Sequence, residues 1–286
     1  MKAVYFKKKK SSVLVTKSVS FLTKLSAKFL PAITLNLAYK LLANPFSKKE
    51  YDFVHLKPSS EKVVQTPNGA VRLYHFEAGK KSVLLTHGWA DSSKSFMSII
   101  EGLNKAGYSV YCFDHIAHGR SEGNKAHLFL FLEGLEAVLK FVNSQPEKLS
   151  AVISHSMGGA ALLNSSAALN KKLKIIMLAP PLAFFKNMFL QFDEFGMARE
   201  VLYLMLEEAS TSFGQRWQDL KIVKHVDKMK ENYFIIHDQD DTQVPFEDTR
   251  KVVAETPAKF LTTKKLGHRG LFRDSKVISQ IVDFIS

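Results

Sequence analysis

The segment 154–159, Ser-His-Ser-Met-Gly-Gly, restricts the fold more than any other part of this chain. An apolar run at 149–153 predicts a short buried strand before it, and a helical pattern begins at Gly159. A serine between a strand and a helix needs small neighbours, because the turn forces an unusual backbone and brings the two elements close together. Gly158 and Gly159 supply that room. The segment therefore predicts a nucleophile elbow, which presents the hydroxyl of Ser156 above a sheet at the N-terminus of a helix.

The other groups that a nucleophilic serine requires have candidates in the expected chain order. Attack by a serine needs a base to take its proton, a carboxylate to orient the base, and donors for the oxyanion. After the serine, an apolar strand at 233–236 ends in a turn with three aspartates, and a strand at 258–266 ends in His268 between two glycines. Upstream, a strand at 82–86 ends in His-Gly-Trp at 87–89. Open α/β sheets place their active sites at such carboxyl ends of separate strands.

In these motifs and their order, the chain resembles the α/β-hydrolase superfamily over residues 60–286, and particularly its small bacterial esterases and acylglycerol lipases. The resemblance implies that Ser156 is the nucleophile and His268 the general base. It implies Asp241 as the orienting acid, because family members place this acid four residues before a proline. Asp240 lies in the same turn and is the second candidate for the acid.

The resemblance also implies an oxyanion hole formed by the backbone N–H groups of Trp89 and Met157. Two positions depart from the usual family pattern: Ser154 stands at the first elbow glycine, and Asp238 replaces a glycine that commonly follows the histidine of that strand. The segment 114–121 resembles the turn that follows the fourth strand in this superfamily, and we interpret it as architectural.

Strands alternate with helices along the chain, which predicts an α/β fold: a mostly parallel twisted sheet flanked by helices, with an antiparallel hairpin at its front. Strands are expected at 61–66, 70–76, 82–86, 108–113, 150–154, 174–178, 233–237 and 258–266, and helices at 93–106, 128–143, 157–169, 246–255 and 274–285. Asn68-Gly69 is the expected hairpin turn. We expect one α/β-hydrolase domain at 51–286, since a chain of this length can bury a single large core.

An insertion at about 182–230 interrupts the alternation, where this superfamily carries its cap. It holds six phenylalanines, of which Phe184, Phe185 and Phe189 are the expected substrate contacts in a short helical cap. An apolar roof would suit an acyl chain, because burial of each methylene contributes about 0.8 kcal/mol. The alternative is that the rings only pack the cap onto the sheet. The insertion has no evident acidic cluster for a peptide amino terminus, which weakens an aminopeptidase interpretation.

Positive charge is concentrated in the N-terminal extension, residues 1–50. These residues hold eleven lysines and one acid, which gives +10 of the net charge of +13. The remaining +3 argues against a nucleic-acid-binding surface on the catalytic domain. The extension has no uninterrupted apolar run of a signal peptide or a spanning helix, so we expect neither. It predicts a basic amphipathic helix before Pro31, which either makes a peripheral contact with an anionic membrane or a partner, or packs on the domain with its lysines in water.

Together these features predict a cytoplasmic serine hydrolase, and the basic extension leaves association with a membrane as an alternative location. Its substrate would be a small-molecule carboxylic ester with a hydrophobic acyl or alcohol part, cleaved through an acyl-enzyme. A thioesterase or amidase with the same three side chains, and a non-catalytic membrane- or partner-binding protein on the same fold, remain alternatives. No cofactor and no metal is predicted, because no histidine pair has metal-ligand spacing. The single cysteine, Cys112, lies in an apolar strand and is expected in the core.

Overall fold

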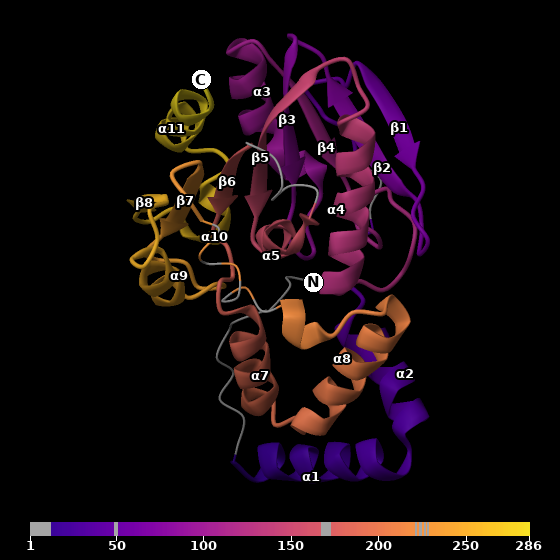
Figure 1. Cartoon of the computed structure of the whole chain (residues 1–286). Coiled ribbons are helices and arrows are strands. Elements are labelled where there is room, and N and C mark those ends of the chain that lie inside the picture. The colour runs from indigo at the N-terminus through magenta and orange to yellow at the C-terminus, as the bar shows by residue number, and fades with distance from the viewer. Residues whose placement is uncertain are drawn as a thin grey trace.

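A computed structural model describes residues 13–48, 51–166, 173–220, 222, 225, 227 and 229–286 of the chain. Within these ranges, eight strands form one sheet in the order β1-β2-β4-β3-β5-β6-β7-β8 (Figure 1). The strands are β1 (Ser60–Val64), β2 (Val71–Phe76), β3 (Lys81–Thr86), β4 (Tyr108–Phe113), β5 (Lys148–His155), β6 (Lys174–Leu178), β7 (Tyr233–Asp238) and β8 (Lys259–Thr263). Strand β2 is antiparallel to both β1 and β4, and all other neighbours are parallel. The predicted mostly parallel sheet with an antiparallel hairpin is confirmed.

The central strands are apolar because helices cover both faces of the sheet. Every residue of β4 is buried, including Cys112. On one face, α3 (Met97–Lys105) and α11 (Ser275–Ile285) contribute to one core cluster; on the other, α4 (Leu128–Val142), α5 (Met157–Asn164) and α9 (Phe246–Val253) contribute to a second. A 3₁₀ turn, η1 (Ser93–Phe96), precedes α3, and the one-turn α10 (Gly267–Gly270) precedes α11.

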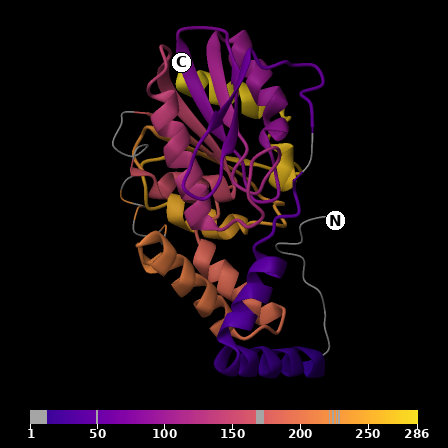
Figure 2. The same ribbon diagram turned by 90° about the vertical axis from the view of Figure 1, so that its right-hand side faces the viewer.

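The remaining helices gather at the carboxyl ends of the parallel strands (Figures 1 and 2). Helices α7 (Phe184–Glu194) and α8 (Arg199–Phe213), with the short η2 (Trp217–Leu220), connect β6 to β7. From the N-terminal extension, α1 (Val13–Phe29) and α2 (Pro31–Leu42) both pack against α8. No helix in the described part of the chain is long and apolar enough to cross a bilayer.

Several expected boundaries differ from the structure. The helix expected at 157–169 ends at Asn164, and residues 167–169 lie outside the described part of the chain. The last strand ends at Thr263 instead of residue 266, because Lys265 adopts a φ of 64° and the N–H of Leu266 bonds to the side chain of Asp238 rather than to a backbone carbonyl of β7. The hairpin strands end at Val64 and begin again at Val71, so the connection is longer than a two-residue turn.

Candidate active site

Ser156 occupies a strained turn between β5 and α5. Its φ of 48° and ψ of −124° lie outside the regions that non-glycine residues usually adopt. The backbone is held there because the N–H of Ser156 donates to Leu178 O at 2.9 Å, in the adjacent strand β6. The turn also requires Gly158, since a Cβ at that position would lie 2.6 Å from the carbonyl oxygen of His87. The turn between β5 and α5 therefore has the geometry of a nucleophile elbow.

Ser154 fits in the elbow despite replacing the usual glycine. Its side chain is fully buried, and its hydroxyl donates to Ile176 O at 3.3 Å. The hydroxyl lies in the sheet core, so the serine needs no change in the elbow backbone.

Asp241 and His268 meet at the ends of β7 and β8. The Nδ1–H of His268 donates to Oδ2 of Asp241 at 2.7 Å, and the Asp241 side chain is fully buried. Oδ1 of Asp241 accepts from the N–H groups of Gln243 at 2.7 Å and Val244 at 3.0 Å. Burial alone would raise the pKa of Asp241, but hydrogen bonds from His237 and His268, and then from the Val244 N–H, outweigh it and hold the pKa well below its usual range. The ionised carboxylate fixes the ring of His268 and leaves Nε2 as the nitrogen that can accept a proton.

The two other carboxylates of the turn have different partners. Asp240 is exposed and accepts from the N–H of Lys265 at 2.8 Å. Asp238 accepts from the Thr263 hydroxyl at 2.6 Å and from the Leu266 N–H at 3.1 Å. Of the three aspartates in this turn, Asp241 is therefore the one that bonds to His268. Asp238 instead links the end of β7 to the chain around the end of β8.

His237 is a partner of Asp241 that sequence reasoning missed. Its Nε2–H donates to Oδ2 of Asp241 at 3.1 Å, and its Nδ1 lies 2.9 Å from the Thr249 hydroxyl. The side chain is fully buried. Its position at the end of β7, four residues before the acid, was the available sequence signal.

His155 joins the elbow to the loop that carries His268. Its Nε2–H donates to the backbone carbonyl of His268 at 3.1 Å, and the two rings have centroids 4.5 Å apart. Burial, and secondly the neighbouring His268, hold the pKa of His155 well below its usual value, so this donor stays neutral. The Ser156 hydroxyl itself has no hydrogen bond to a described residue. The hydrogen bond between a catalytic hydroxyl and its base is often long or absent until the substrate binds.

The loop after β3 lies directly against the elbow. A Cβ on Gly88 would lie 2.8 Å from Cβ of Ser156, so only glycine permits this approach. On one side of Trp89, His87 Nδ1–H donates to Gly88 O at 2.7 Å; on the other, Nε2 of His118 accepts from the Ala90 N–H at 3.1 Å. These bonds fix the backbone on both sides of Trp89.

His118 can accept the hydrogen bond from the Ala90 N–H only while its Nε2 is unprotonated. Burial, and secondly the neighbouring His87, hold the pKa of His118 well below its usual value. The second proposed donor, Met157, is the first residue of α5, where backbone N–H groups have no partner within the helix. Both donors therefore border the serine from two sides.

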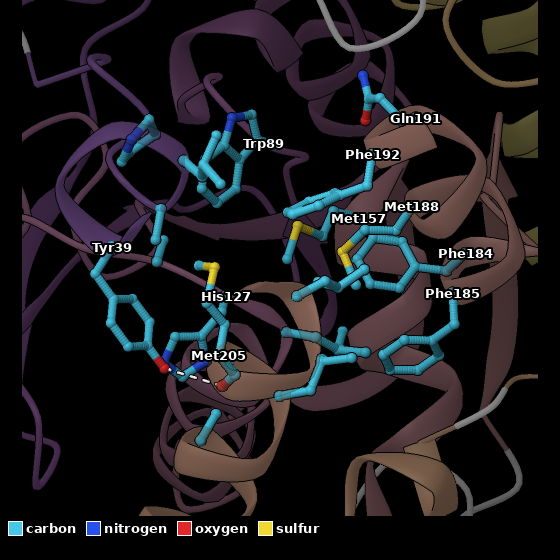
Figure 3. A pocket seen from close by; sticks show the side chains of 18 of the residues that line it. Tyr39, Trp89, His127, Met157, Phe184, Phe185, Met188, Gln191, Phe192 and Met205 are labelled. Atoms are coloured by element: carbon cyan, nitrogen blue, oxygen red, sulfur yellow. Dashed lines mark hydrogen bonds between the residues drawn. The ribbon is translucent and has the colours of Figure 1, made fainter. Parts of the chain in front are cut away.

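An apolar cavity of about 360 Å³ lies between this loop, the cap and the N-terminal extension (Figure 3). Trp89 and Met157 form its boundary on the side of the elbow. From the cap, the lining includes Phe184, Phe185, Met188, Phe192, Met205 and Ala209. From the extension it includes Tyr39, Leu41, Leu42 and Phe46. The size is that of an ordinary small-molecule site.

Only two of the three phenylalanines expected to contact the substrate line the cavity. Phe184 and Phe185 line the cavity, whereas Phe189 does not. The ring of Phe189 packs instead against Tyr203, at 5.1 Å between centroids, and Trp217, at 6.0 Å. It lies one turn beyond Phe185, at the edge of the face of α7 that lines the cavity, so the helical spacing of the aromatics could not identify which rings reach the cavity.

Tyr39 is the lining residue that connects α2 with α8. Its hydroxyl bonds to the carboxylate of Glu208 and lies 3.1 Å from Met205 O (Figure 3). Beside it, burial lowers the pKa of His127 to about 4, helped by the nearby Lys125. The lining therefore carries no charge near neutral pH. Within the described ranges, no cluster of three or more metal-ligating side chains is found.

Comparison with known proteins agrees with the fold and the motifs. The chain is 31% identical over 103 residues to a monoacylglycerol lipase of Mycolicibacterium smegmatis, which is 35% of this chain and 37% of that protein. It is 26% identical over 107 residues to a monoglyceride lipase of Rattus norvegicus, covering 36% of this chain and 35% of that protein. The matches thus span about a third of these curated relatives.

Similarity to solved structures extends over nearly the whole fold. An esterase of Pyrococcus furiosus, Pf2001, superposes with a TM-score of 0.64 at 22% identity, covering 86% of this chain and 97% of that one. Est1E of Butyrivibrio proteoclasticus superposes with a TM-score of 0.59 at 16% identity, covering 79% and 96%. The sequence profile of the family described as "Serine aminopeptidase, S33" matches residues 77–243. The chain belongs to this family of α/β-hydrolases.

Proposed function

We propose that this protein is a serine hydrolase that cleaves carboxylic esters with a hydrophobic acyl or alcohol part. His268 Nε2 takes the proton of Ser156 as the hydroxyl oxygen attacks the ester carbonyl, and Asp241 stabilises the resulting imidazolium. The N–H groups of Trp89 and Met157 receive the oxyanion. The tetrahedral intermediate collapses as His268 protonates the leaving alcohol. Water, deprotonated by the same ring, then releases the acid from the acyl-enzyme.

The observation that carries this proposal is that the His268–Asp241 pair and the apolar cavity both lie beside the Ser156 turn. His268 and Asp241 form a buried pair bonded at 2.7 Å, and the loop of His268 is tied to the strained Ser156 turn through His155. The cavity begins at the two residues whose N–H groups would bind the oxyanion. A carbonyl held there would extend its apolar substituent into the cavity.

The family description raises aminopeptidase activity as a second candidate. A peptide amino terminus carries a positive charge, which needs a carboxylate or several carbonyl oxygens to replace its water. The described residues that line the cavity include no aspartate and no glutamate. An uncharged acyl chain fits this lining better. Amino-acyl p-nitroanilides, assayed beside p-nitrophenyl esters, should therefore be the poorer substrates.

The proposal is tested by labelling the folded protein with a fluorophosphonate, which reacts with an activated serine. Wild-type protein should be labelled and should hydrolyse p-nitrophenyl esters, and Ser156→Ala should lose both properties. Ser154→Ala is the matched control, because this buried serine lies two residues away in the same turn and bonds only to Ile176 O. Labelling that persists in Ser156→Ala, or its absence from folded wild-type protein, would refute the proposal and favour a non-catalytic role. Parallel assays with acyl-thioesters and acyl-amides distinguish the thioesterase and amidase alternatives.

A further inference from the structure

Helix α1 turns its small polar side chains toward the protein. Ala27 is its buried residue, and Thr16, Ser20, Thr23 and Ser26 are partly buried on the same side. The hydroxyl of Thr23 accepts from the N–H of Ala198 at 2.9 Å. Near Thr16, the chain approaches so closely that a Cβ on Gly196 would lie 2.7 Å from the Thr16 carbonyl oxygen. The contact with the cap is thus made by small groups and hydrogen bonds.

The large apolar side chains of α1 from Phe21 onward point the other way. Phe21, Leu25 and Phe29 follow one another at intervals of four residues, which places them on one face of the helix. Phe21 is 63% exposed and Phe29 is 66% exposed. An ordinary surface helix buries its apolar stripe and leaves its polar side in water. Here the arrangement is reversed, so packing onto the domain cannot explain why these residues are apolar.

Helix α2 continues the same pattern. Its buried residues are Thr34 and Ala38, whereas Ile33, Leu37 and Leu41 are more than half exposed. In the described part of the chain, nine of the fourteen large apolar side chains that are exposed belong to this extension. They are Phe21, Leu22, Leu25, Phe29, Leu30, Ile33, Leu37, Leu41 and Phe46. An apolar surface of this extent on a folded protein indicates a binding partner.

The charge of the extension identifies the kind of partner. Lys17 continues the row of Phe21, Leu25 and Phe29, and the ammonium of Lys28 lies 5.3 Å from the centre of the Phe29 ring. Both lysines are exposed. Apolar side chains bordered by lysines fit the boundary between anionic headgroups and acyl chains, where the rings enter the lipid and the ammonium groups meet phosphates. The net +10 of residues 1–50 adds attraction toward such a surface.

The same surface adjoins the opening of the cavity. Leu41 and Phe46 both line the cavity and are 57% and 64% exposed, so they belong to the cavity wall and to the apolar surface at once. We propose that α1 and α2 form a docking surface for an anionic phospholipid bilayer, and that a lipophilic substrate passes from the bilayer into the cavity beside Leu41 and Phe46. The docking part stands independently of catalysis, whereas the transfer part rests on the proposed function.

The test uses the full-length protein and vesicles of phosphatidylglycerol and phosphatidylcholine. Wild-type protein should co-sediment with them, and less so at high salt, because the lysine contribution is screened. The combined variant Phe21→Ser, Leu25→Ser, Phe29→Ser and Ile33→Ser should bind at least about tenfold more weakly, since each side chain loses its apolar transfer into the lipid. Lys17→Glu with Lys28→Glu should weaken binding to anionic vesicles but change little with pure phosphatidylcholine. None of these six residues lines the cavity.

Val54→Ser with Val63→Ser is the control, because these apolar side chains are exposed on the hydrolase domain, by 65% and 48%. It should bind vesicles like wild type. Hydrolysis of a water-soluble short-chain ester should be unchanged in every variant, while hydrolysis of a vesicle-embedded long-chain monoester should fall with binding. If wild-type protein did not hydrolyse the water-soluble ester, the proposed function would be refuted, but the docking surface would not. Vesicle binding that is absent, or indifferent to the serine variant, would refute the docking surface, as would a dimer in solution that the serine variant dissociates.

Discussion

The carboxylate of Asp241 is saturated with donors. One oxygen accepts from two backbone N–H groups, and the other accepts from both His237 and His268. Backbone donors hold the carboxylate in one orientation, and His237 occupies a second site on the oxygen that faces His268. The Nδ1–H of His268 therefore meets a fixed, ionised acceptor. This arrangement selects the tautomer in which Nε2 can act as a base.

Replacing Asp241 by asparagine should lower kcat for ester hydrolysis by about 10³–10⁴-fold, because the amide no longer selects that tautomer or stabilises the imidazolium. KM should change little. The measurement is steady-state hydrolysis of a p-nitrophenyl ester, with a circular-dichroism melt to show that the variant is folded.

Asp240→Asn provides the control for this substitution, since Asp240 is the adjacent carboxylate and is bonded only to the Lys265 N–H. Its kcat should stay within about threefold of wild type, as expected for an exposed polar substitution. The assignment of the acid to Asp241 would be wrong if Asp240→Asn produced the larger loss.

At the scale of elements, strand ends bring the candidate site together. The elbow follows β5, Trp89 follows β3, Asp241 follows β7 and His268 follows β8. These strands are parallel and lie in one sheet, so all four ends reach the same edge. Sequence alone predicts this edge well, because buried parallel strands are continuous apolar runs and the turns after them carry the polar residues.

Asp238 shows what sequence patterns could not predict. Members of the family commonly have a glycine at this position, where this chain has Asp238. In the structure its carboxylate accepts from Thr263, Leu266 and Asp240, and so joins the two loops that hold the acid and the histidine. Thr263 and Leu266 lie 25 and 28 residues away from Asp238 along the chain, and no local pattern specifies them. The sequence also could not predict that His237 bonds to Asp241, because this contact depends on the conformation of the turn between them.

The role of Asp238 leads to a stability prediction with a defined pH dependence. Burial opposes ionisation, but the hydrogen bonds from Thr263 and the backbone prevail and lower the pKa of Asp238 below its usual value. A carboxyl whose pKa falls on folding stabilises the native state above its unfolded pKa, and this contribution disappears as pH falls through the folded pKa. Asp238→Asn should therefore reduce the free energy of unfolding by about 1.5–3 kcal/mol at neutral pH.

Urea unfolding at several pH values tests this expectation. The difference between wild type and Asp238→Asn should narrow below about pH 4, where the Asp238 carboxyl of the unfolded chain begins to take up a proton, and should vanish below the folded pKa. Asp283→Asn is the control, because Asp283 is exposed on α11 and should change stability little at any pH. A difference for Asp238→Asn that stays constant down to acid pH would contradict the role of the ionised carboxylate.

At the scale of the whole molecule, three separate parts of the chain enclose the cavity. The hydrolase domain supplies Trp89 and Met157, the cap supplies α7 and α8, and the extension supplies α2. A periodic apolar stripe in the extension is visible in the sequence, but the sequence does not reveal which side of the extension will face the cap. The pairing of α2 with α8 depends on contacts such as Tyr39 with Glu208, which are 169 residues apart. This is why the cap was expected to form the cavity and the extension was not.

Ala209 tests whether this cavity holds the acyl chain. It is a small, buried residue of α8 that lines the cavity. Ala209→Phe should fill part of the cavity and exclude two or three methylenes of a long chain. Because each methylene contributes about 0.8 kcal/mol, kcat/KM for long-chain p-nitrophenyl esters should fall about 15- to 60-fold. The value for the acetate should remain close to wild type, since a short chain does not reach the filled volume.

The matched control for this substitution is Thr211→Phe, which adds the same ring at an exposed position of the same helix. It should leave the chain-length profile unchanged. Met205→Ala, which enlarges the cavity, should shift the preference toward longer chains and separates an effect of cavity size from a general loss of packing. Equal losses for acetate and palmitate in Ala209→Phe, with an unchanged melting temperature, would mean that the acyl chain binds outside this cavity. In that case the ester specificity would have to come from another surface of the cap.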